Sequence, residues 1–576
     1  MSAESFIQQK AAAAIQAIYG TEVAETSLQV SVTRKEFEGD YTLVTFPLLK
    51  ITHQAPDATG NAIGQWLVDN VPEIAAYNSV KGFLNLSFSP VYWSENLQAI
   101  AADDSFGQLP GTGRRIMVEF SSPNTNKPLH LGHIRNNLLG DSVSRILKAC
   151  GNDVIKSTIV NDRGVHICKS MYAWEKCFNG ATPESTGKKG DHLVGDCYVA
   201  YAQMEKEHPE IIDDVHKMLV LWEQGDSHVR KLWAMMNGWV YAGFDETYAA
   251  LGITFDQVDH ESETYLLGKE LVQKGLAEGV FVKDPDGSVW CDLTADGLDR
   301  KLVLRGDGTS VYITQDLGTA ERRFANFNLD SHVYVVGNEQ DYHFQVLKLI
   351  LKKLGFDWAD QIYHLSYGMV ELPEGKMKSR EGTVVDADDL IQSMYEEAKK
   401  TSEESGKLAD ISEEEREKLY HMIGLGALKY FIIKVDPKKT MLFNPKESID
   451  FNGNTGPFIQ YTHARICSIL RKASVPFGPA DVNASVEPSA KEIRLTQLLS
   501  LYPAKVAEAG AALSPAVIAN YAYDLAKEFN QYYHDTPILK EENEGILKYR
   551  LELIAVMART LRSAMALLGI ELPERM

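Results

Sequence analysis

The stretch RIMVEFSSPNTNKPLHLGHIRNNLLGDSVSRILKACG, residues 115–151, contains the pattern that decides the fold of this chain. Residues 115–120 form a short β-type run, and two prolines interrupt the loop that follows it. From residue 130 to residue 150, apolar side chains recur at helical spacing along one side. Gly151 stands where a helix C-terminal cap belongs. A strand, a loop and a helix in this order open a parallel α/β unit.

The alternation of strands and helices continues outward from this stretch. We expect strands at 153–160, 311–314, 332–336 and 363–370, and helices at 190–250 and 344–354. An acidic and polar run, residues 403–418, marks a boundary, and beyond it the pattern is almost wholly helical. The fold class is therefore α/β with a Rossmann-like parallel sheet, preceded by an α+β part and followed by an all-α part.

Three parts can be separated along the 576 residues, because one hydrophobic core does not organise a chain of this length. Residues 1–108 combine a helical opening with strand-like runs and end in a Gly- and Pro-containing linker. Residues 113–400 form the α/β part, with an insertion at about 170–300. Residues 412–576 form the helical part.

Composition and charge limit the class of protein. The chain is 44% apolar and 24% charged, as soluble proteins are, and no apolar run reaches the ~20 residues that span a bilayer. The first residues lack a signal-peptide pattern, and six scattered cysteines fit the cytoplasm, so we expect a cytoplasmic protein without membrane contact. The net charge of −21 argues only weakly against a nucleic-acid partner, because local basic clusters, such as those around Lys434 and Arg465, matter more.

The strongest local signal is His130-Leu131-Gly132-His133 at the start of the predicted helix. Two imidazoles three residues apart point the same way on a first helical turn, where free N–H groups and positive potential also favour phosphate. Gly132 removes a side chain where a nucleotide must approach, and Lys127 adds a cation just upstream. The alternative is that both histidines only cap and pack the helix.

A second signal is GKMKSREGT, residues 375–383, which follows a strand-like run that includes Met369. Three cations and two hydroxyl side chains on a Gly-bounded loop suit a clamp for a triphosphate. By itself the loop is equally well explained as a basic surface loop.

At this separation in an α/β chain, the two motifs resemble the paired ATP signatures of class I aminoacyl-tRNA synthetases. The surrounding sequence narrows the resemblance to the arginyl-tRNA synthetase family, and the stretches that carry it are residues 118–135, 312–316, 340–343 and 451–465. The motifs at 39–41 and 82–85 resemble the added N-terminal domain of that family, and the ending 567–576 also fits. The resemblance covers essentially the whole chain and implies an anticodon-binding bundle at its C-terminal end.

The resemblance implies a pocket for arginine. Glu119 and Asp316 would supply carboxylates to the guanidinium group, and Tyr312 would add a hydroxyl group. Asn124 and Gln340 match positions that hold the α-amino and carboxylate groups. Paired carboxylates suit the planar fork of donors that arginine carries. The alternative for the two acids is structural ion pairing.

The resemblance also implies the reaction: arginine is activated with ATP to arginyl-adenylate and then transferred to tRNA(Arg), with Mg²⁺ bridging the ATP phosphates. It assigns catalytic roles to Lys127, His130, Gly132, His133 and Lys376. It assigns ATP binding to His130, Gly132, His133, Met369, Lys376, Met377, Lys378 and Ser379. Family precedent implies that the first step requires the RNA and that the protein is a monomer.

One departure concerns the clamp motif. The family group usually reads Lys-Met-Ser-Lys-Ser, whereas this chain reads Lys-Met-Lys-Ser-Arg from residue 376. Ser379 therefore stands where the second lysine is expected. Either Lys127 or Lys378 takes its place.

Transfer RNA contacts are implied at both ends of the chain. Phe83 and Asn85 match positions that touch the D-loop. In the C-terminal part the candidates are Phe458, Tyr461, Tyr533 and Met576, since unpaired bases stack on aromatic side chains. For these four residues the alternative is ordinary core packing.

Three other functions compete with this interpretation. A class I synthetase for another amino acid would share the ATP motifs but not Glu119, Tyr312 and Asp316. A small-molecule nucleotidylyltransferase also uses a HxGH motif but is far shorter and lacks the helical tail. A non-catalytic RNA-binding paralogue would not need to retain both histidines and both acids.

Overall fold

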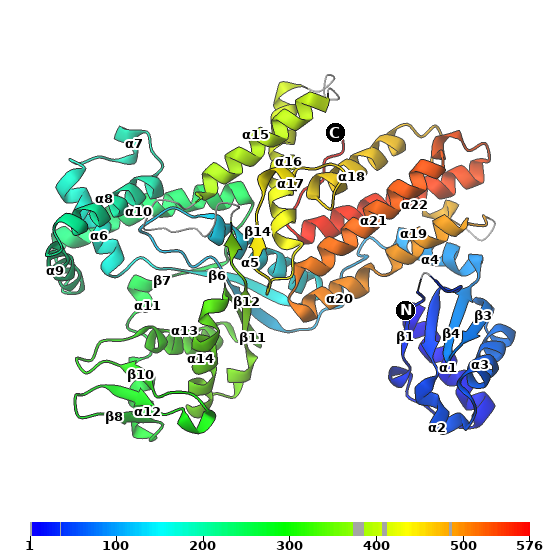
Figure 1. Cartoon of the computed structure of the whole chain (residues 1–576), viewed down its shortest axis with the longest axis horizontal. Helices are drawn as coiled ribbons and strands as arrows, with labels where there is room; N and C mark the ends of the chain where they lie inside the picture. The colour runs from blue at the N-terminus through cyan, green and yellow to red at the C-terminus, as the bar shows by residue number, and fades with distance from the viewer. Residues whose placement is uncertain (1–2, 35, 372–384, 406–411, 483–485) are drawn as a thin grey trace.

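The computed structural model describes residues 3–34, 36–371, 385–405, 412–482 and 486–576. In Figure 1 the N-terminal residues form a separate lobe at the lower right, and the C-terminal helices lie above it. The remaining residues surround a central sheet and extend to the left as two further lobes.

The central sheet has five strands in the order β12-β11-β5-β6-β7, and each neighbouring pair is parallel. Their bounds are β5 (Arg115–Glu119), β6 (Asp153–Val160), β7 (Gln257–His260), β11 (Ser331–Gly337) and β12 (Ile362–Tyr367). The chain first adds strands on one side of β5 and then on the other, so the order reverses between β5 and β11. Open α/β sheets bind ligands at such a reversal, outside the carboxyl ends of the strands. The predicted Rossmann-like parallel sheet is confirmed.

Helix α5 (Leu131–Ala149) follows β5 and packs against the sheet on one side and against C-terminal helices on the other. Burial is therefore not restricted to one face, and the helix also buries polar side chains such as Arg135, Asn137 and Asp141. Gly140 permits the close approach to the sheet, since a Cβ atom there would lie 2.1 Å from Cγ of Phe120.

The insertion between β6 and β11 is mostly helical in its first half. It contains α6 (Val165–Cys177), α7 (Pro183–Thr186), α8 (Gly190–Glu207), α9 (Ile211–Glu223) and α10 (Ser227–Leu251). The helix expected at 190–250 is thus three helices, because Pro209 and Gly225 interrupt the pattern. The second half contains α11 (Glu261–Thr264), α12 (Lys269–Ala277) and an antiparallel sheet of β8 (Phe281–Lys283), β9 (Val289–Cys291) and β10 (Lys301–Leu304).

The prediction of a strand at 311–314 is wrong, because Val311 caps helix α13 (Tyr312–Phe327) and the next three residues form its first turn. The β-branched side chains favoured a strand. In the structure the Thr314 hydroxyl accepts the Val311 N–H at 3.0 Å and donates to the carbonyl of Val303. These side-chain contacts replace backbone pairing at the helix start. Helix α14 (Asp341–Lys353) then follows β11.

The N-terminal lobe is α+β, as predicted. Its antiparallel sheet has the order β1-β2-β4-β3, formed by β1 (Val30–Val32), β2 (Tyr41–Val44), β4 (Phe83–Phe88) and β3 (Ile74–Val80). Its helices are α1 (Ala3–Tyr19), α2 (Leu49–Thr52), α3 (Pro56–Asn70) and α4 (Pro90–Ala102). Arg559 joins the lobe to the C-terminal part by donating to the carbonyl of Ile100 at 2.6 Å.

The C-terminal part is helical. Its helices are α15 (Ala387–Ser405), α16 (Glu413–Ile433), α17 (Pro445–Ser448), α18 (Gly456–Arg471), α19 (Ala490–Ser500), α20 (Tyr502–Ala512), α21 (Pro515–Asp535) and α22 (Glu544–Leu567). One short strand interrupts the helical pattern, since β14 (Met441–Leu442) pairs with β13 (Val370–Glu371). Helices α15 and α16 pack together, so residues 403–418 connect two packed helices. No helix among the described residues is both long and apolar enough to cross a bilayer.

The close approach of α5 to the sheet can be tested with two glycine-to-alanine variants. Gly140→Ala places a methyl group against Phe120, and such overpacking costs about 1–3 kcal/mol. Gly238→Ala, inside α10 and with nothing within 4 Å of its Cβ position, gains about 1 kcal/mol of helix propensity. Thermal unfolding followed by circular dichroism should show a lower apparent Tm for Gly140→Ala and an equal or higher one for Gly238→Ala. Equal shifts in both variants would contradict the packing argument.

Candidate active site

The loop after β5 leaves the sheet through a sharp turn at the point where the strand order reverses. Ser121 and Ser122 have φ values of 72° and 47°, a left-handed backbone that costs energy in residues other than glycine. Asn136 on α5 accepts the Ser121 N–H at 2.6 Å, and Tyr248 on α10 lies 2.7 Å from the Ser121 hydroxyl. The turn is therefore held from two helices.

The two histidines cap the N-terminus of α5. The Nδ1 atom of His130 accepts the N–H of Gly132 at 3.1 Å, and the Nδ1 atom of His133 accepts the N–H of His130 at 3.1 Å. An imidazole nitrogen that accepts a hydrogen bond cannot carry the proton of the neutral ring. In each neutral ring the proton is therefore on Nε2, which is available as a donor.

Burial keeps both rings uncharged. Desolvation, with a contribution from the nearby Lys127 ammonium, lowers the pKa of His130 to about 4. Desolvation also lowers the pKa of His133 well below its usual value, and it lowers the pKa of Lys127. Capping and ligand binding are thus not alternatives, because Nδ1 serves the helix while Nε2–H remains for a phosphate or hydroxyl oxygen.

Gly132 has a role that the sequence did not suggest. A Cβ atom at this position would lie 3.0 Å from Cε1 and 3.1 Å from Nδ1 of His130. Any side chain would therefore press on the ring that caps the helix. The absence of a side chain protects the position of His130.

A buried cluster of charged residues lies at the carboxyl end of β5. The Arg323 guanidinium, 1% exposed, bonds to Glu119 and to Asp259, with Nη2 to Oδ2 of Asp259 at 2.7 Å. Desolvation raises the pKa of Glu119, Arg323 opposes this, and the charges of Asp316 and Asp259 raise it further. Glu119 is thus in an ion pair within the protein, and its second oxygen is 3.4 Å from the Ser122 hydroxyl.

Two further acids belong to the same electrostatic environment. Asp316, on the second turn of α13, is partly exposed and bonds to Nε2 of His343 at 2.6 Å. The pKa of Glu261 is raised to about 7, mainly by burial. Of the nearby charges, the Arg163 guanidinium lowers this pKa and the Asp316 carboxylate raises it. The structure therefore brings together the two acids expected for arginine, and it adds Glu261 and Asp259. Glu261 follows strand β7 directly, which is the signal that could have identified it.

The three remaining residues expected for arginine lie at the surface of the same edge. Tyr312 is 79% exposed at the start of α13, one turn before Asp316. Gln340 is exposed just after β11. Asn124 is exposed after β5 and forms a bridge with Asn161, which follows β6. All three side chains are accessible to a small molecule.

The clamp residues Lys376, Met377, Lys378 and Ser379 lie outside the described residues. Both described flanks of that segment contact the beginning of α5. Before it, Met369 accepts from Arg135 at 3.3 Å through its carbonyl, and its side chain is 46% exposed. The same guanidinium donates to the Lys439 carbonyl at 2.7 Å. After it, the Leu131 N–H donates to the Val385 carbonyl at 3.0 Å.

One cluster could hold a metal ion by residue type, namely Asp191, His192 and Asp388, whose ligand atoms lie within 4.8 Å of one another. The Lys189 ammonium donates to Asp388 at 2.6 Å and to Asp191 at 3.3 Å. A cation of the protein itself therefore already compensates these carboxylates, and the cluster does not fit a metal site.

The residues expected to contact RNA in the N-terminal lobe differ in exposure. Phe83 is 44% exposed and forms an edge-to-face pair with the exposed Phe46 at 5.7 Å. Asn85 is only 2% exposed, and its amide oxygen accepts from Thr42 at 2.6 Å. Asn85 shares its face of β4 with the exposed Phe83, but Thr42 on the neighbouring strand and the backbone at Gly39 lie against it. Its contact with RNA stays a prediction.

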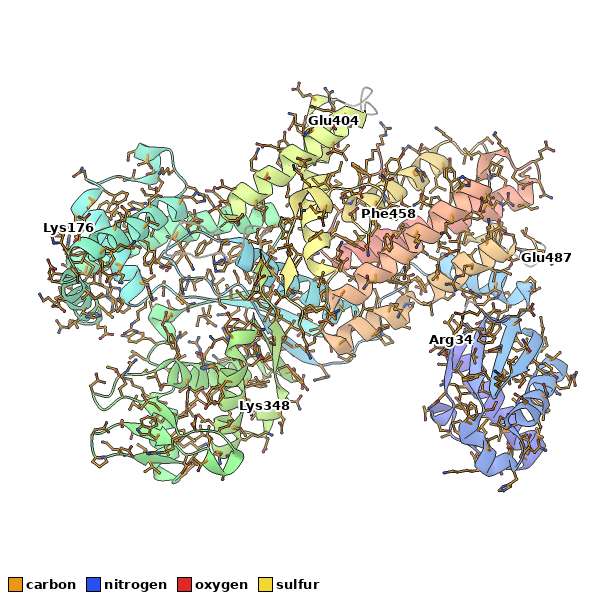
Figure 2. The ribbon with its side chains drawn as sticks, in the orientation of Figure 1. Arg34, Lys176, Lys348, Glu404, Phe458 and Glu487 are labelled. Carbon is orange, nitrogen blue, oxygen red and sulfur yellow. The ribbon has the colours of Figure 1, made fainter. Side chains whose placement is uncertain are left out.

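An aromatic and basic group lies on α18 and α21. The Arg465 guanidinium stacks 4.8 Å from the Tyr461 ring and 5.6 Å from the Tyr533 ring, and the Tyr533 side chain is 37% exposed. Phe458, labelled in Figure 2, packs 5.4 Å from Tyr523 and lines a cavity of about 530 Å³. Phe458 and Met576 are both partly buried against the helical core.

Comparisons with known proteins agree with this arrangement. A family model described as tRNA synthetases class I (R), catalytic domain, matches residues 96–444. A model described as DALR anticodon binding domain matches residues 459–576.

Full-length relatives and solved structures carry the similarity further. The chain is 56% identical to an arginine–tRNA ligase of Bacteroides thetaiotaomicron over 98% of both chains, and 54% identical to one of Porphyromonas gingivalis over 100% of both. It superimposes on the Thermus thermophilus arginyl-tRNA synthetase with a TM-score of 0.84, at 26% identity and 100% coverage of both chains. A Plasmodium falciparum arginyl-tRNA synthetase shares the fold, with a TM-score of 0.79 at 20% identity, covering 100% of this chain and 99% of that one.

The buried ion pairs of Arg323 can be tested by Arg323→Met. This change leaves Glu119 and Asp259 without their buried cation, and breaking such a pair costs about 3–5 kcal/mol. Losing Arg323 raises the pKa of Glu119 in the folded variant further above its value in the unfolded chain. The folded variant therefore binds a proton at Glu119 more tightly than the unfolded chain does, so its stability gains as the pH falls. The stability deficit should therefore shrink as the pH falls and Glu119 becomes protonated.

The control for this test is Arg322→Met. Arg322 bonds to the other oxygen of Asp259 at 2.9 Å but is partly exposed. Thermal unfolding between neutral and mildly acidic pH should show a large, pH-dependent loss for Arg323→Met and a small one for Arg322→Met. Equal losses in the two variants would show that burial of Arg323 does not matter.

Proposed function

The chain belongs to the class I arginyl-tRNA synthetase family, and we propose that it attaches arginine to its transfer RNA with ATP. The arginine carboxylate attacks the α-phosphorus of ATP, which gives arginyl-adenylate and releases pyrophosphate. A terminal ribose hydroxyl of tRNA(Arg) then attacks the acyl carbon and releases AMP. The observation that carries the residue-level proposal is the pair of uncharged, capping histidines beside a buried acidic cluster at the reversal of strand order.

ATP is proposed to bind at the N-terminus of α5. His130 and His133 would donate from Nε2 to phosphate or ribose oxygens, because their Nδ1 atoms are occupied by the backbone. The helix N-terminus adds favourable potential for phosphate. Since the rings are neutral, positive charge for the transition state has to come from Lys127, and from Lys376 of the clamp motif. Mg²⁺ would arrive with ATP, bound to its phosphate oxygens.

Arginine is proposed to bind against Glu119 and Asp316, with Tyr312 at the rim. An arginine side chain would bring positive charge into a region where neighbouring acids raise the pKa of Glu119. Neutral citrulline would bring no positive charge to these acids, and lysine lacks the planar fork of donors. Asn124 and Gln340 are proposed to hold the α-amino and carboxylate groups, since both side chains are exposed at the same edge of the sheet.

Transfer RNA is proposed to contact both ends of the chain. Tyr461, Arg465 and Tyr533 form a stacking surface suited to unpaired bases, with Phe458 beside the neighbouring cavity. Phe83 with Phe46 is the corresponding surface in the N-terminal lobe. We further propose that the protein acts as a cytoplasmic monomer.

The proposed function is tested by ATP–pyrophosphate exchange with each amino acid, with and without transfer RNA. Exchange should occur with arginine, should require tRNA(Arg), and should be negligible with lysine or citrulline. Asp316→Asn should raise the KM for arginine at least tenfold, because about 1.4 kcal/mol of charge-assisted bonding is lost. Exchange with another amino acid and none with arginine would refute the assignment, and RNA binding without exchange would indicate the non-catalytic paralogue.

The role of Lys127 is tested by Lys127→Ala. We expect a loss of about 10²–10³ in the rate of adenylate formation, which is the scale of removing one charge-stabilising group, while the KM for arginine stays nearly unchanged. The matched control is Lys148→Ala at the other end of α5, where the lysine is exposed. Pre-steady-state exchange rates measure both variants. Unchanged turnover in Lys127→Ala would leave Lys378 as the residue that compensates for the altered clamp motif.

A further inference from the structure

We propose that Lys189 and Asp388, supported by His192, form a latch between the helical insertion and the start of α15 that positions His130 for ATP. We call these three residues the latch. The inference rests on the proposed ATP site, and it assigns a positioning role to residues that do not themselves cap α5 or belong to either signature motif.

The first step of the argument is a short strand pairing beside His130. The Leu131 N–H donates to the Val385 carbonyl, and the Ala387 N–H donates to the Leu129 carbonyl, both at 3.0 Å. His130 and Asp386 are the bridge partners between these two bonds, in antiparallel arrangement. Residues 385–387 therefore hold the backbone on both sides of the histidine whose ring caps α5.

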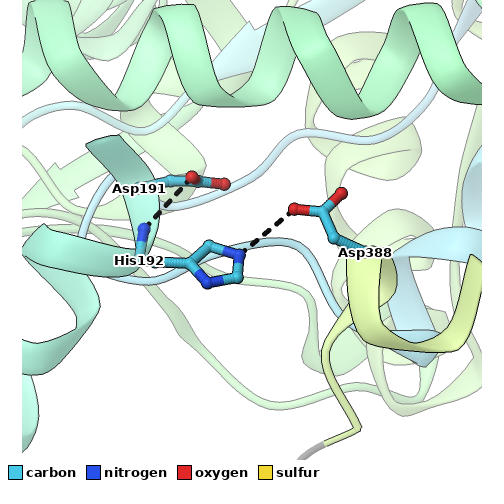
Figure 3. A group of neighbouring side chains, drawn as sticks. All are labelled: Asp191, His192 and Asp388. Atoms are coloured by element: carbon cyan, nitrogen blue, oxygen red, sulfur yellow. Dashed lines mark hydrogen bonds and ion pairs between the residues drawn. The ribbon is translucent and has the colours of Figure 1, made fainter. Parts of the chain in front are cut away.

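The second step is what holds residues 385–387 in place. Asp386 and Asp388 lie at the start of α15, where one oxygen of Asp386 accepts the Asp388 N–H at 2.8 Å. From the insertion, Lys189 donates to Oδ2 of Asp388 at 2.6 Å, and Thr247 on α10 donates to Oδ1 at 2.9 Å. The His192 ring lies 3.1 Å from Asp388 and 3.4 Å from Asp386. Figure 3 shows His192 and Asp388 facing each other from the two elements.

The third step is the strength of the latch. The side chains of Lys189 and Asp388 are 16% and 31% exposed, and Lys189 also bonds to the fully buried Asp191 and to Thr247 at 2.6 Å. A partly buried, multiply bonded pair is worth more than an exposed one, because water screens it less. The neighbouring pair Lys188–Asp196 on the same segment is about half exposed, and among the described residues no ion pair joins Lys188 to α15.

The fourth step links the latch to the ATP motif. His192 and Asp386 line one cavity of about 240 Å³ together with Lys127 and His130. A shift of α8 relative to α15 would therefore change the surroundings of both ATP-site residues. Misplacement of catalytic groups by about 1 Å is enough to reduce rates substantially.

The experiment measures ATP–pyrophosphate exchange by the full-length protein with tRNA(Arg) present, for Lys189→Met, Asp388→Asn and the double variant. Each single variant should raise the KM for ATP about tenfold, with the KM for arginine changed less than about twofold. The double variant should resemble the single ones, because both remove the same interaction. Lys189→Arg should recover most of the ATP affinity, and Lys188→Met is the matched control that should behave as wild type.

Three outcomes would overturn the latch. Unchanged KM for ATP in both single variants would show that the pair does not position the site. Parallel increases in the KM for ATP and arginine, together with a lower apparent Tm, would show a merely structural role. Fully additive effects in the double variant would show that the two residues act separately. The wild-type protein is measured first. If it shows no arginine-dependent exchange, the proposed function is refuted, and the latch is not what has failed.

Discussion

The buried N-terminus of α5 is the constraint on which the site depends. The first N–H groups of a helix have no partner within the helix, and a helix enclosed by a sheet and by other helices has little access to water. In this chain the Val385 carbonyl accepts the Leu131 N–H, and two imidazole nitrogens accept those of Gly132 and of the capping residue His130. The same bonds fix the tautomer of each ring, and the same burial keeps the rings uncharged. The contacts that satisfy the fold therefore also prepare two neutral Nε2–H donors for a ligand.

A second consequence of burial is the treatment of charge beside those donors. Glu119 ends a central strand and is desolvated there, which raises its pKa, and the Arg323 guanidinium from α13 opposes that rise. Arg323 bonds to both Glu119 and Asp259, and beside this ion pair lie Asp316, which is partly exposed and bonded to His343, and Glu261. A site of this kind combines a permanent internal cation, which stabilises the fold, with further acids that we propose a guanidinium ligand contacts. The proposed selectivity for a charged ligand then follows from the attraction of these acids for a cation.

The sequence predicted the local parts of this arrangement and missed the long-range ones. Periodicity identified β5 and α5, and spacing identified the two histidines, because both signals reside within a few residues. Residues 311–314 were misassigned as a strand, since only contact with Val303 shows why Thr314 starts a helix. The partnership of Glu119 with Arg323 joins positions 204 residues apart and leaves no periodic signal. The motif that includes Asn85 predicts a position that touches RNA but not the Thr42 hydroxyl that bonds to this side chain from the neighbouring strand.

Helix α5 also connects the ATP site to the helical C-terminal part. Its first turns carry the histidines, whereas Ser142, farther along, donates to the Leu567 carbonyl at the end of α22. Nearby, the buried Lys429 of α16 donates at 2.7 Å to the carbonyls of Leu251 and Gly569, so one ammonium joins the end of α10 to the turn after α22. Burial lowers the pKa of Lys429 to about 8, an electrostatic cost that the two carbonyl bonds partly offset.

Because a helix is stiff along its axis, any displacement of the C-terminal bundle on α5 has to be accommodated at the end that holds His130 and His133. The insertion lies beside that end through Gly195 of α8, where a Cβ atom would lie 2.8 Å from Pro128, and beside the other end through Gly252 after α10, whose carbonyl accepts from Arg145 at 3.5 Å. The positions of the helices that match an anticodon-binding domain and of the histidines proposed to bind ATP are therefore linked by one shared element.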